Sequence, residues 1–148
     1  MVNSMDQYSK PLRKKETKFG TKFYFNPRRT KPGRELVVMY DKRFPIVDFE
    51  PTYSYIVRFL EKNNAAGNHY HKRKEEVFIP IEGTFEVHLE DVSTKEREIV
   101  SLKSSDIVAF HFRTGIAHKI ISKNDSGLLL TMSSDPSRDE DEIDYKVE

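Results

Sequence analysis

Cysteine is absent from this chain of 148 residues. Without thiols the protein has no disulfide framework and no thiolate metal site, which leaves histidine and carboxylate as its strong metal ligands. The absence also fits a reducing compartment, and we expect a cytoplasmic protein.

Long apolar runs are missing as well. Nowhere do about 18 apolar residues follow one another, the length that a membrane helix needs. The opening residues, MVNSMDQYSKPLRKKE, also lack the apolar run that forms the core of a signal peptide. We therefore expect an unexported, soluble protein that has no membrane partner.

Neither sign of charge dominates. Lys and Arg total 25 against 24 Asp and Glu, so the formal net charge is +1. Such a chain has no overall field to attract nucleic acid or an anionic membrane, and any partner must be recognised locally. We expect the basic run Arg13-Lys14-Lys15 to be a solvated surface, and we expect no nucleic-acid partner.

The length is that of one domain with one core. Residues 1–20 are polar and Lys-rich, with Pro11 and Gly20 as breakers, which is typical of an arm. We assign residues 21–134 to a single β-domain. Residues 135–148 are mostly acidic and are expected to form a terminal tail or a short helix.

Short runs of β-branched and aromatic residues, separated by turn-formers, fill the chain from Thr21 onward. The expected strands are Lys22–Asn26, Leu36–Tyr40, Tyr53–Leu60, Val77–Ile81, Thr84–Leu89, Glu96–Leu102, Ile107–Phe112, Ala117–Lys123 and Leu128–Ser133. Alternation predicts that Phe85, Val87 and Leu89 face the core. So many short strands in one small domain predict an all-β sandwich or closed barrel, because an open sheet would leave unpaired edges.

Two histidines, His69 and His71, stand at positions i and i+2 and so share one face of an extended strand. Glu76 follows across a short polar turn, where the next strand begins and can bring a carboxylate to the same point. His118 shares a strand face with the apolar Ile120, which favours the interior. Three imidazoles and a carboxylate suit one divalent transition ion, Fe, Mn, Ni, Cu or Zn.

Less specific interpretations of these residues stay open. Glu76 lies among charged neighbours and can be a solvated surface group, with Glu75 as the competing ligand. His118 can be a core histidine that donates to a backbone carbonyl. We interpret His88 and His111 as structural.

The strand that leads to His69 carries two candidates for substrate binding, Tyr55 and Arg58. Tyr55 lies on one face of this strand and Arg58 on the other. A tyrosine hydroxyl or an arginine fork that reaches the cavity can hold a sugar or a phosphate.

The segment from Gly67 to Gly83 contains His-x-His, then Glu76 after four residues, then Gly83 after six more, and it resembles the first cupin motif. Ser105 through His118 resembles the second. This resemblance implies a double-stranded β-helix, the cupin or jelly-roll barrel, with a metal held by His69, His71, Glu76 and His118.

A narrower resemblance rests on His69-Tyr70-His71-Lys72, on the spacing to His118 and on the closing stretch Met132 to Tyr145. These features are similar to the nucleotide-sugar 3,4-ketoisomerases, cupins in which the matching histidine pair is implied to work as acid and base without metal. Those enzymes tend to carry Gln where this chain has Glu76. A carboxylate there restores the metal-ligand set.

Three functions follow from these resemblances. The leading hypothesis is an isomerase or epimerase of a nucleotide-linked keto-sugar, as in polysaccharide biosynthesis, in which His69 and His71 transfer the protons. The second is a metal-dependent cupin enzyme, such as a dioxygenase or a phosphosugar isomerase. The third is a non-catalytic barrel that binds a small molecule. Edge strands of such barrels pair readily, and we expect a homodimer.

Overall fold

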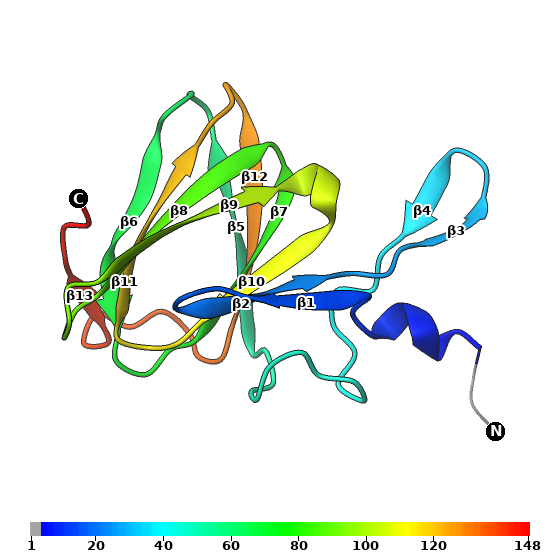
Figure 1. The fold of residues 1–148 in the computed structure, drawn as a ribbon, viewed down its shortest axis with the longest axis horizontal. Helices are drawn as coiled ribbons and strands as arrows, with labels where there is room; N and C mark the ends of the chain where they lie inside the picture. Colours follow the sequence, from blue (N-terminus) through cyan, green and yellow to red (C-terminus); the bar gives the residue numbers. More distant parts are fainter. Residues whose placement is uncertain (1–3) are drawn as a thin grey trace.

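The computed structural model describes residues 4–148, and its regular structure is almost entirely β (Figure 1). Six strands form one antiparallel sheet in the order β1-β2-β10-β7-β12-β5, and five form a second in the order β13-β6-β11-β8-β9. The strands of the first sheet are β1 (Arg13–Glu16), β2 (Gly20–Tyr24), β5 (Tyr53–Phe59), β7 (Glu76–Glu82), β10 (Val108–Phe112) and β12 (Gly127–Ser133). Those of the second are β6 (Ala65–His71), β8 (Thr84–Asp91), β9 (Arg97–Lys103), β11 (Ile116–Ser122) and β13 (Glu142–Asp144). The predicted all-β jelly-roll class is confirmed.

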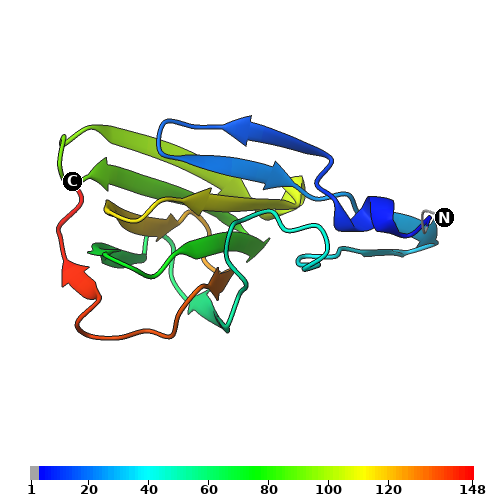
Figure 2. The same cartoon turned by 90° about the horizontal axis from the view of Figure 1, so that it is seen from below.

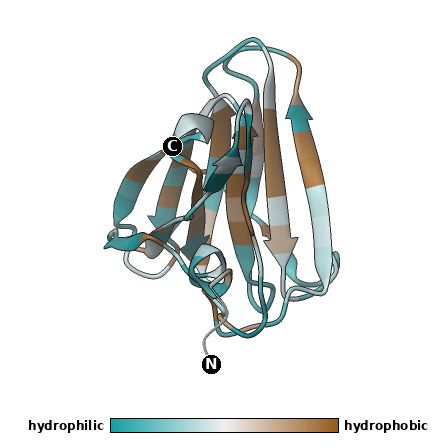
Figure 3. Cartoon of the chain, turned by 90° about the vertical axis from the view of Figure 1, so that its right-hand side faces the viewer, coloured by the Kyte–Doolittle hydropathy of each residue, from teal (hydrophilic) through white to brown (hydrophobic). Residues whose placement is uncertain are grey.

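The main core lies between the two sheets and is formed by apolar residues that alternate along the strands. Figure 3 shows the hydrophobic bands along these strands. Phe85, Val87 and Leu89 of β8 are fully buried there, as their alternation predicts. Phe78, Phe110 and Leu129 from the facing sheet complete the contact.

A second apolar cluster covers the outer face of the six-stranded sheet. Its sheet residues are Phe23, Val77, Ile79, Ala109 and Met132, and the irregular segment 37–50 packs onto them. The predicted strand Leu36–Tyr40 is therefore wrong beyond its first residue. Val37 and Met39 are partly buried as a cover over the sheet instead of pairing in a ladder.

Both polar ends of the chain contain strands that their composition did not predict. β1 lies within the segment assigned to an arm, whose first three residues are outside the described part of the chain, and pairs with β2. β13 lies within the acidic tail and pairs with β6, so this tail forms a strand and no helix within residues 135–148. The two ends lie on opposite sides of the molecule (Figure 2).

A third, two-stranded sheet projects from the barrel beside the N-terminal 3₁₀ turn η1 (Asp6–Ser9), as Figure 1 shows. It consists of β3 (Arg28–Lys31) and β4 (Arg34–Leu36), joined through Gly33 at φ +75°. A second 3₁₀ turn, η2 (Ser104–Asp106), links β9 to β10. Across the described residues, none of the helices has the length and apolar character needed to cross a membrane.

Candidate active site

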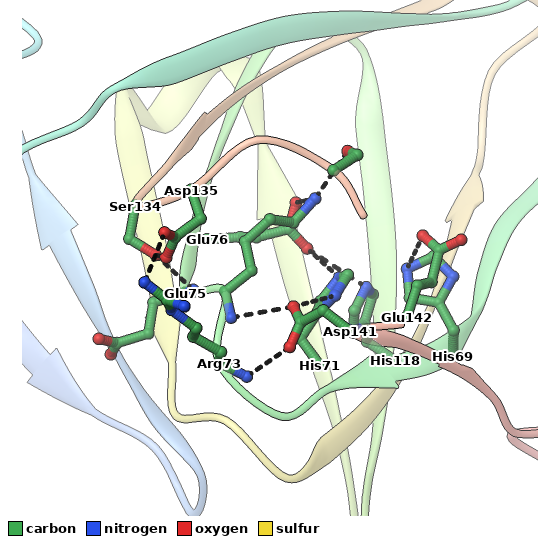
Figure 4. A network of polar contacts seen from close by, with 12 residues as sticks. His69, His71, Arg73, Glu75, Glu76, His118, Ser134, Asp135, Asp141 and Glu142 are labelled. Carbon is green, nitrogen blue, oxygen red and sulfur yellow. Dashed lines mark hydrogen bonds and ion pairs between the residues drawn. The ribbon is translucent and has the colours of Figure 1, made fainter. Parts of the chain in front are cut away.

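One end of the barrel interior is polar, and it holds the four residues that the sequence singles out (Figure 4). β6 supplies His69 and His71, and its neighbour β11 supplies His118, directly opposite His69 in the ladder. Glu76 begins β7 in the facing sheet and meets the histidines across the interior. One potential ligand atom from each of the four lies within 4.8 Å of the others.

An irregularity in β6 sets the position of His69. Lys119 pairs with Gly67 while His118 pairs with His69, so Asn68 is an extra residue in β6, with φ +63°. Gly67 has φ +103°, and a Cβ there would lie 2.6 Å from the backbone oxygen of His118. Only glycine permits this approach, which brings the histidine strand against β11.

The three imidazoles are packed together. The ring centroids of His69 and His71 are 4.9 Å apart, and those of His69 and His118 are 4.6 Å apart. Phe112 and Phe78 pack against His118 from the apolar side, with ring centroids 5.1 and 5.6 Å from that of His118. His69 keeps 21% of its side chain exposed, whereas His71 and His118 are buried. His69 is therefore the histidine most open to an incoming molecule.

Glu76 is the centre of the polar contacts, and its two oxygens face different groups. Oε1 lies 3.0 Å from Nε2 of His71 and 3.7 Å from Nε2 of His118. Oε2 accepts a 2.6 Å hydrogen bond from the Tyr55 hydroxyl and lies 3.6 Å from the Lys74 ammonium. Burial raises the pKa of Glu76, but these contacts outweigh it and lower the pKa to about 2. Glu76 is thus a buried carboxylate.

Burial shifts the pKa of the histidines downward, the opposite direction from its effect on Glu76, because it disfavours the charged form of an imidazole. It lowers the pKa of His118 to about 3, although the nearby Glu76 charge opposes this shift. It also lowers the pKa of His69, opposed by Glu142. Both rings are therefore neutral at physiological pH and able to accept a proton or bind a cation.

The structure separates the remaining candidates from one another. Glu75, the competing ligand, points away from the cluster and pairs with His111 at 3.1 Å. Tyr55 reaches the site through Glu76, and burial raises the pKa of its hydroxyl. Arg58 is exposed on the other face of β5, so its predicted place in the same cavity is not observed; strand alternation turns it outward. His88 lies 3.5 Å from Glu86, away from the four residues.

Sequence reasoning missed three charged residues that surround the cluster. Lys74 is only 3% exposed, and its ammonium contacts Glu76 and, at 3.0 Å, the Ser137 hydroxyl. Asp141 lies 3.4 Å from Nδ1 of His71, and Glu142 lies 3.6 Å from Nε2 of His69. Lys74 stands in a run of charges and the two acids in an acidic tail, where composition indicates solvent. No local pattern distinguishes them from their exposed neighbours.

Several polar atoms of this region are buried without a hydrogen-bond partner. They are Nδ1 and Nε2 of His71, Oε1 of Glu76, Nδ1 of His118, and the hydroxyls of Thr131 and Ser133. Such atoms are rare in folded proteins and indicate a site that takes a polar occupant. The donor set fits a divalent transition ion, and the paired histidines equally fit proton transfer to and from a bound organic molecule.

Comparison with protein families matches residues 23–147 to the family model described as FdtA, WxcM-like, C-terminal. A comparison with curated proteins finds no match.

Solved structures of the same fold include sugar 3,4-ketoisomerases and a sugar epimerase. QdtA, a sugar 3,4-ketoisomerase from Thermoanaerobacterium thermosaccharolyticum in complex with TDP, is 20% identical at a TM-score of 0.73, over 86% of this chain and 89% of that one. WlaRB, a TDP-quinovose 3,4-ketoisomerase from Campylobacter jejuni, is 20% identical at 0.74, over 86% and 93%. The dTDP-4-dehydrorhamnose 3,5-epimerase from Bacillus anthracis is 13% identical at 0.76, over 88% and 81%. At these identities the likeness shows the fold.

Proposed function

The chain belongs to the WxcM-like, C-terminal (FdtA) family, and from this premise we propose that it is an isomerase or epimerase that acts on a nucleotide-linked keto-sugar. The observation that carries the proposal is the histidine pair at the polar end of the barrel, with ring centroids 4.9 Å apart. The ketoisomerases and the epimerase of the same fold support the substrate class.

The reaction needs two proton transfers. A base removes a proton from the carbon next to the ketone, which gives an enediol, and an acid then returns a proton to the neighbouring carbon or to the other face of the same carbon. The first outcome moves the carbonyl by one position, and the second inverts a centre. His69 and His71 divide these roles, because the pKa of an imidazole lies near working pH and small environmental shifts move it.

The surrounding residues hold this pair in place. Glu76 stays ionised beside His71, and Tyr55 and Lys74 bind its other oxygen. Tyr55 lies at the edge of the same cluster, where its ring and hydroxyl can contact a sugar. Phe78 and Phe112 pack against His118, whose ring lies against that of His69, and so exclude water from the deep side of the cluster.

The test is incubation of the protein with TDP-4-keto-6-deoxyglucose while the sugar is followed by NMR. We expect a new keto-sugar or epimer, and exchange of the proton beside the carbonyl with solvent. His71→Asn is expected to lower the rate about 10²–10⁴-fold, the scale of one proton-transfer group. The matched control, His88→Asn, changes a histidine outside the cluster. A wild-type protein that exchanges no proton of any nucleotide-linked keto-sugar would overturn the proposal.

A second candidate, a metal-dependent cupin enzyme, is favoured by the ligand atoms of His69, His71, Glu76 and His118, which lie within 4.8 Å of one another. These four residues would hold one divalent transition ion, which would act as a Lewis acid toward the oxygens of a bound substrate. Elemental analysis of the purified protein separates the candidates. About one tightly bound ion per chain, lost in His69→Ala and retained in His88→Ala, favours the metal enzyme. Full activity in metal-free protein favours the histidine pair alone.

The predicted homodimer and cytoplasmic location remain predictions from the sequence. Sedimentation of the purified protein at micromolar concentration tests the first.

A further inference from the structure

Lys74 is buried beside the candidate active site, and its ammonium takes no part in the proposed proton transfers. Only 3% of its side chain is exposed. The ammonium lies 3.6 Å from Oε2 of Glu76, 3.0 Å from the Ser137 hydroxyl and 4.7 to 5.6 Å or so would not describe it better than its printed 5.6 Å from the centre of the Tyr55 ring. A lysine is almost never buried to this extent unless it is paired, and the partner of opposite charge here is Glu76.

The two oxygens of Glu76 lie in different surroundings. Oε2 accepts the hydrogen bond from the Tyr55 hydroxyl, at 2.6 Å, and contacts the Lys74 ammonium. Oε1 faces His71 and His118 and is buried without a hydrogen-bond partner (Figure 4). A divalent ion held by the histidines would bind Oε1. It would therefore share one carboxylate with an ammonium that is already in contact with it.

Two cations on one carboxylate repel each other, and burial makes this repulsion strong because little solvent screens it. The side chains of Lys74 and Glu76 are 3% and 2% exposed. The charge of the ammonium also offsets that of the carboxylate, so the pair attracts a further cation less than a lone carboxylate does. The contact between Lys74 and Glu76 thus opposes the metal binding that the four ligand atoms otherwise permit.

Two other carboxylates, those of Asp141 and Glu142, flank the histidine pair and favour a cation, but solvent or hydrogen bonds weaken their effect. The side chain of Glu142 is 44% exposed, so solvent screens its charge. That of Asp141 is 13% exposed, and it already accepts hydrogen bonds from the backbone N–H groups of Arg73 and Lys74. The Lys74 ammonium is more deeply buried than either carboxylate and contacts Glu76 itself.

We propose that Lys74 is the internal counter-ion of Glu76 and lowers the affinity of the four-residue cluster for a divalent metal ion. Its ammonium takes the place of a metal as the cationic partner of this carboxylate. The inference rests on the proposed function, because an isomerase that works through the histidine pair needs imidazoles that no metal occupies. The net charge of the pair is zero, so the barrel interior accommodates Glu76 without a metal.

Metal titration of the untagged protein tests the proposal without any substrate. Lys74→Gln removes the charge and keeps a polar group beside Glu76 and Ser137. We expect this variant to bind Co²⁺ at least about tenfold more tightly than the wild type, as measured by the visible absorption of the bound ion and, with Zn²⁺, by calorimetry. The matched control, Lys72→Gln, removes the same charge from an exposed position two residues earlier and should bind both ions as the wild type does.

Equal affinities for the wild type and Lys74→Gln would overturn the proposal. An equal gain in Lys72→Gln would also overturn it, because the gain would then reflect overall charge alone. Adding Glu76→Gln to Lys74→Gln is expected to remove the gain, and a gain that survives this change would place the ion elsewhere and count against the proposal.

The wild type decides the matter if Lys74→Gln does not fold. Release of Zn²⁺ to EDTA supports the proposal, and one Zn²⁺ per chain retained against EDTA would overturn it. The proposed reaction is judged separately. Tighter metal binding by Lys74→Gln, in a protein whose wild type turns over no keto-sugar, would overturn the reaction and leave the role of Lys74 supported.

Discussion

The two polar ends of this chain have similar sequences in one respect and opposite roles in the structure. Both are rich in charge, and both contain a short strand on the outer edge of a sheet. β1 at the N-terminal end is exposed at all four positions, and its residues contact solvent and β2. The C-terminal segment buries Val147 and places Asp141 and Glu142 against the histidines.

The difference lies in hydrogen-bond partners rather than in composition. The Asp141 carboxylate accepts hydrogen bonds from the backbone N–H groups of Arg73 and Lys74, just after β6, and both Asp141 and Glu142 lie beside an imidazole of β6. The basic side chains of β1 meet solvent or lie over an aromatic ring, as Arg13 does over Tyr24 at 3.7 Å. The charge of a surface residue usually contributes little to stability. A charge held beside a buried group, in contrast, changes the hydrogen bonding and the protonation of that group.

The largest contrast is expected from removing two charges at either end. Asp141→Asn with Glu142→Gln takes the carboxylates from the histidine pair, and we expect proton exchange of the keto-sugar to slow about 10²–10⁴-fold. Lys14→Gln with Lys15→Gln removes as many charges from exposed positions of β1 and should change the rate less than about twofold. Equal effects in solvent-exchange NMR would break the comparison.

A lysine from each region gives the next largest difference. Lys74 is buried between Glu76 and Ser137, so Lys74→Met leaves Glu76 without its ammonium partner. We expect unfolding in urea to show a loss of about 3 kcal/mol, the scale for breaking a buried pair. Lys14→Met on exposed β1 should stay within about 0.5 kcal/mol. If the Lys74→Met variant is as stable as the wild type, the buried Lys74–Glu76 contact does not contribute to the stability of the protein.

Acid should weaken the histidine end of the barrel. The folded pKa of His118 is lowered from 6.5 to about 3, so the unfolded chain binds more protons between these values and stability falls as pH falls below 6.5. One such group contributes a loss of about 2–3 kcal/mol between pH 6.5 and 4.5. Glu76, lowered to about 2, adds a further loss below pH 4.5. Denaturant titrations should show this slope and its reduction in His118→Gln; an unchanged slope would contradict the shift.

The smallest expected difference between the two ends is in the stability lost when an apolar side chain is shortened. Val147 is 2% exposed near the C-terminus, and Val147→Ala should cost about 1–2 kcal/mol in thermal or urea unfolding. Leu12, next to β1, is 66% exposed, and Leu12→Ala should fall within about 0.5 kcal/mol. A larger loss from Leu12 would mean that the N-terminal end is anchored as firmly as the C-terminal one.

The sequence predicted most of the barrel, because period-two alternation directly reports the buried face of a strand. It also predicted that His69 and His71 share a face and that His118 points inward, for the same reason. Their convergence with Glu76 depends on two sheets facing each other, which periodicity alone does not give. The convergence of the four residues was predicted from the resemblance to the two cupin motifs.

The residues that escaped prediction all depend on contacts between distant segments. Asp141 is distinguished from Asp139 only by the N–H groups of Arg73 and Lys74, which are 68 and 67 residues away in sequence. Lys74 is distinguished from Lys72 only by its burial in the fold. Edge strands such as β1 and β13 lack an apolar face, so alternation does not reveal them.

The central claim is that the histidine pair of this barrel moves protons next to the carbonyl of a nucleotide-linked keto-sugar. Metal-stripped protein in deuterium oxide with TDP-4-keto-6-deoxyglucose tests it most directly, read by proton NMR of the sugar. We predict that deuterium enters beside the carbonyl with the wild type and with His88→Asn, and that His71→Asn slows this at least about 10²-fold. Equal rates for wild type and His71→Asn, or no exchange by the wild type, would contradict the account.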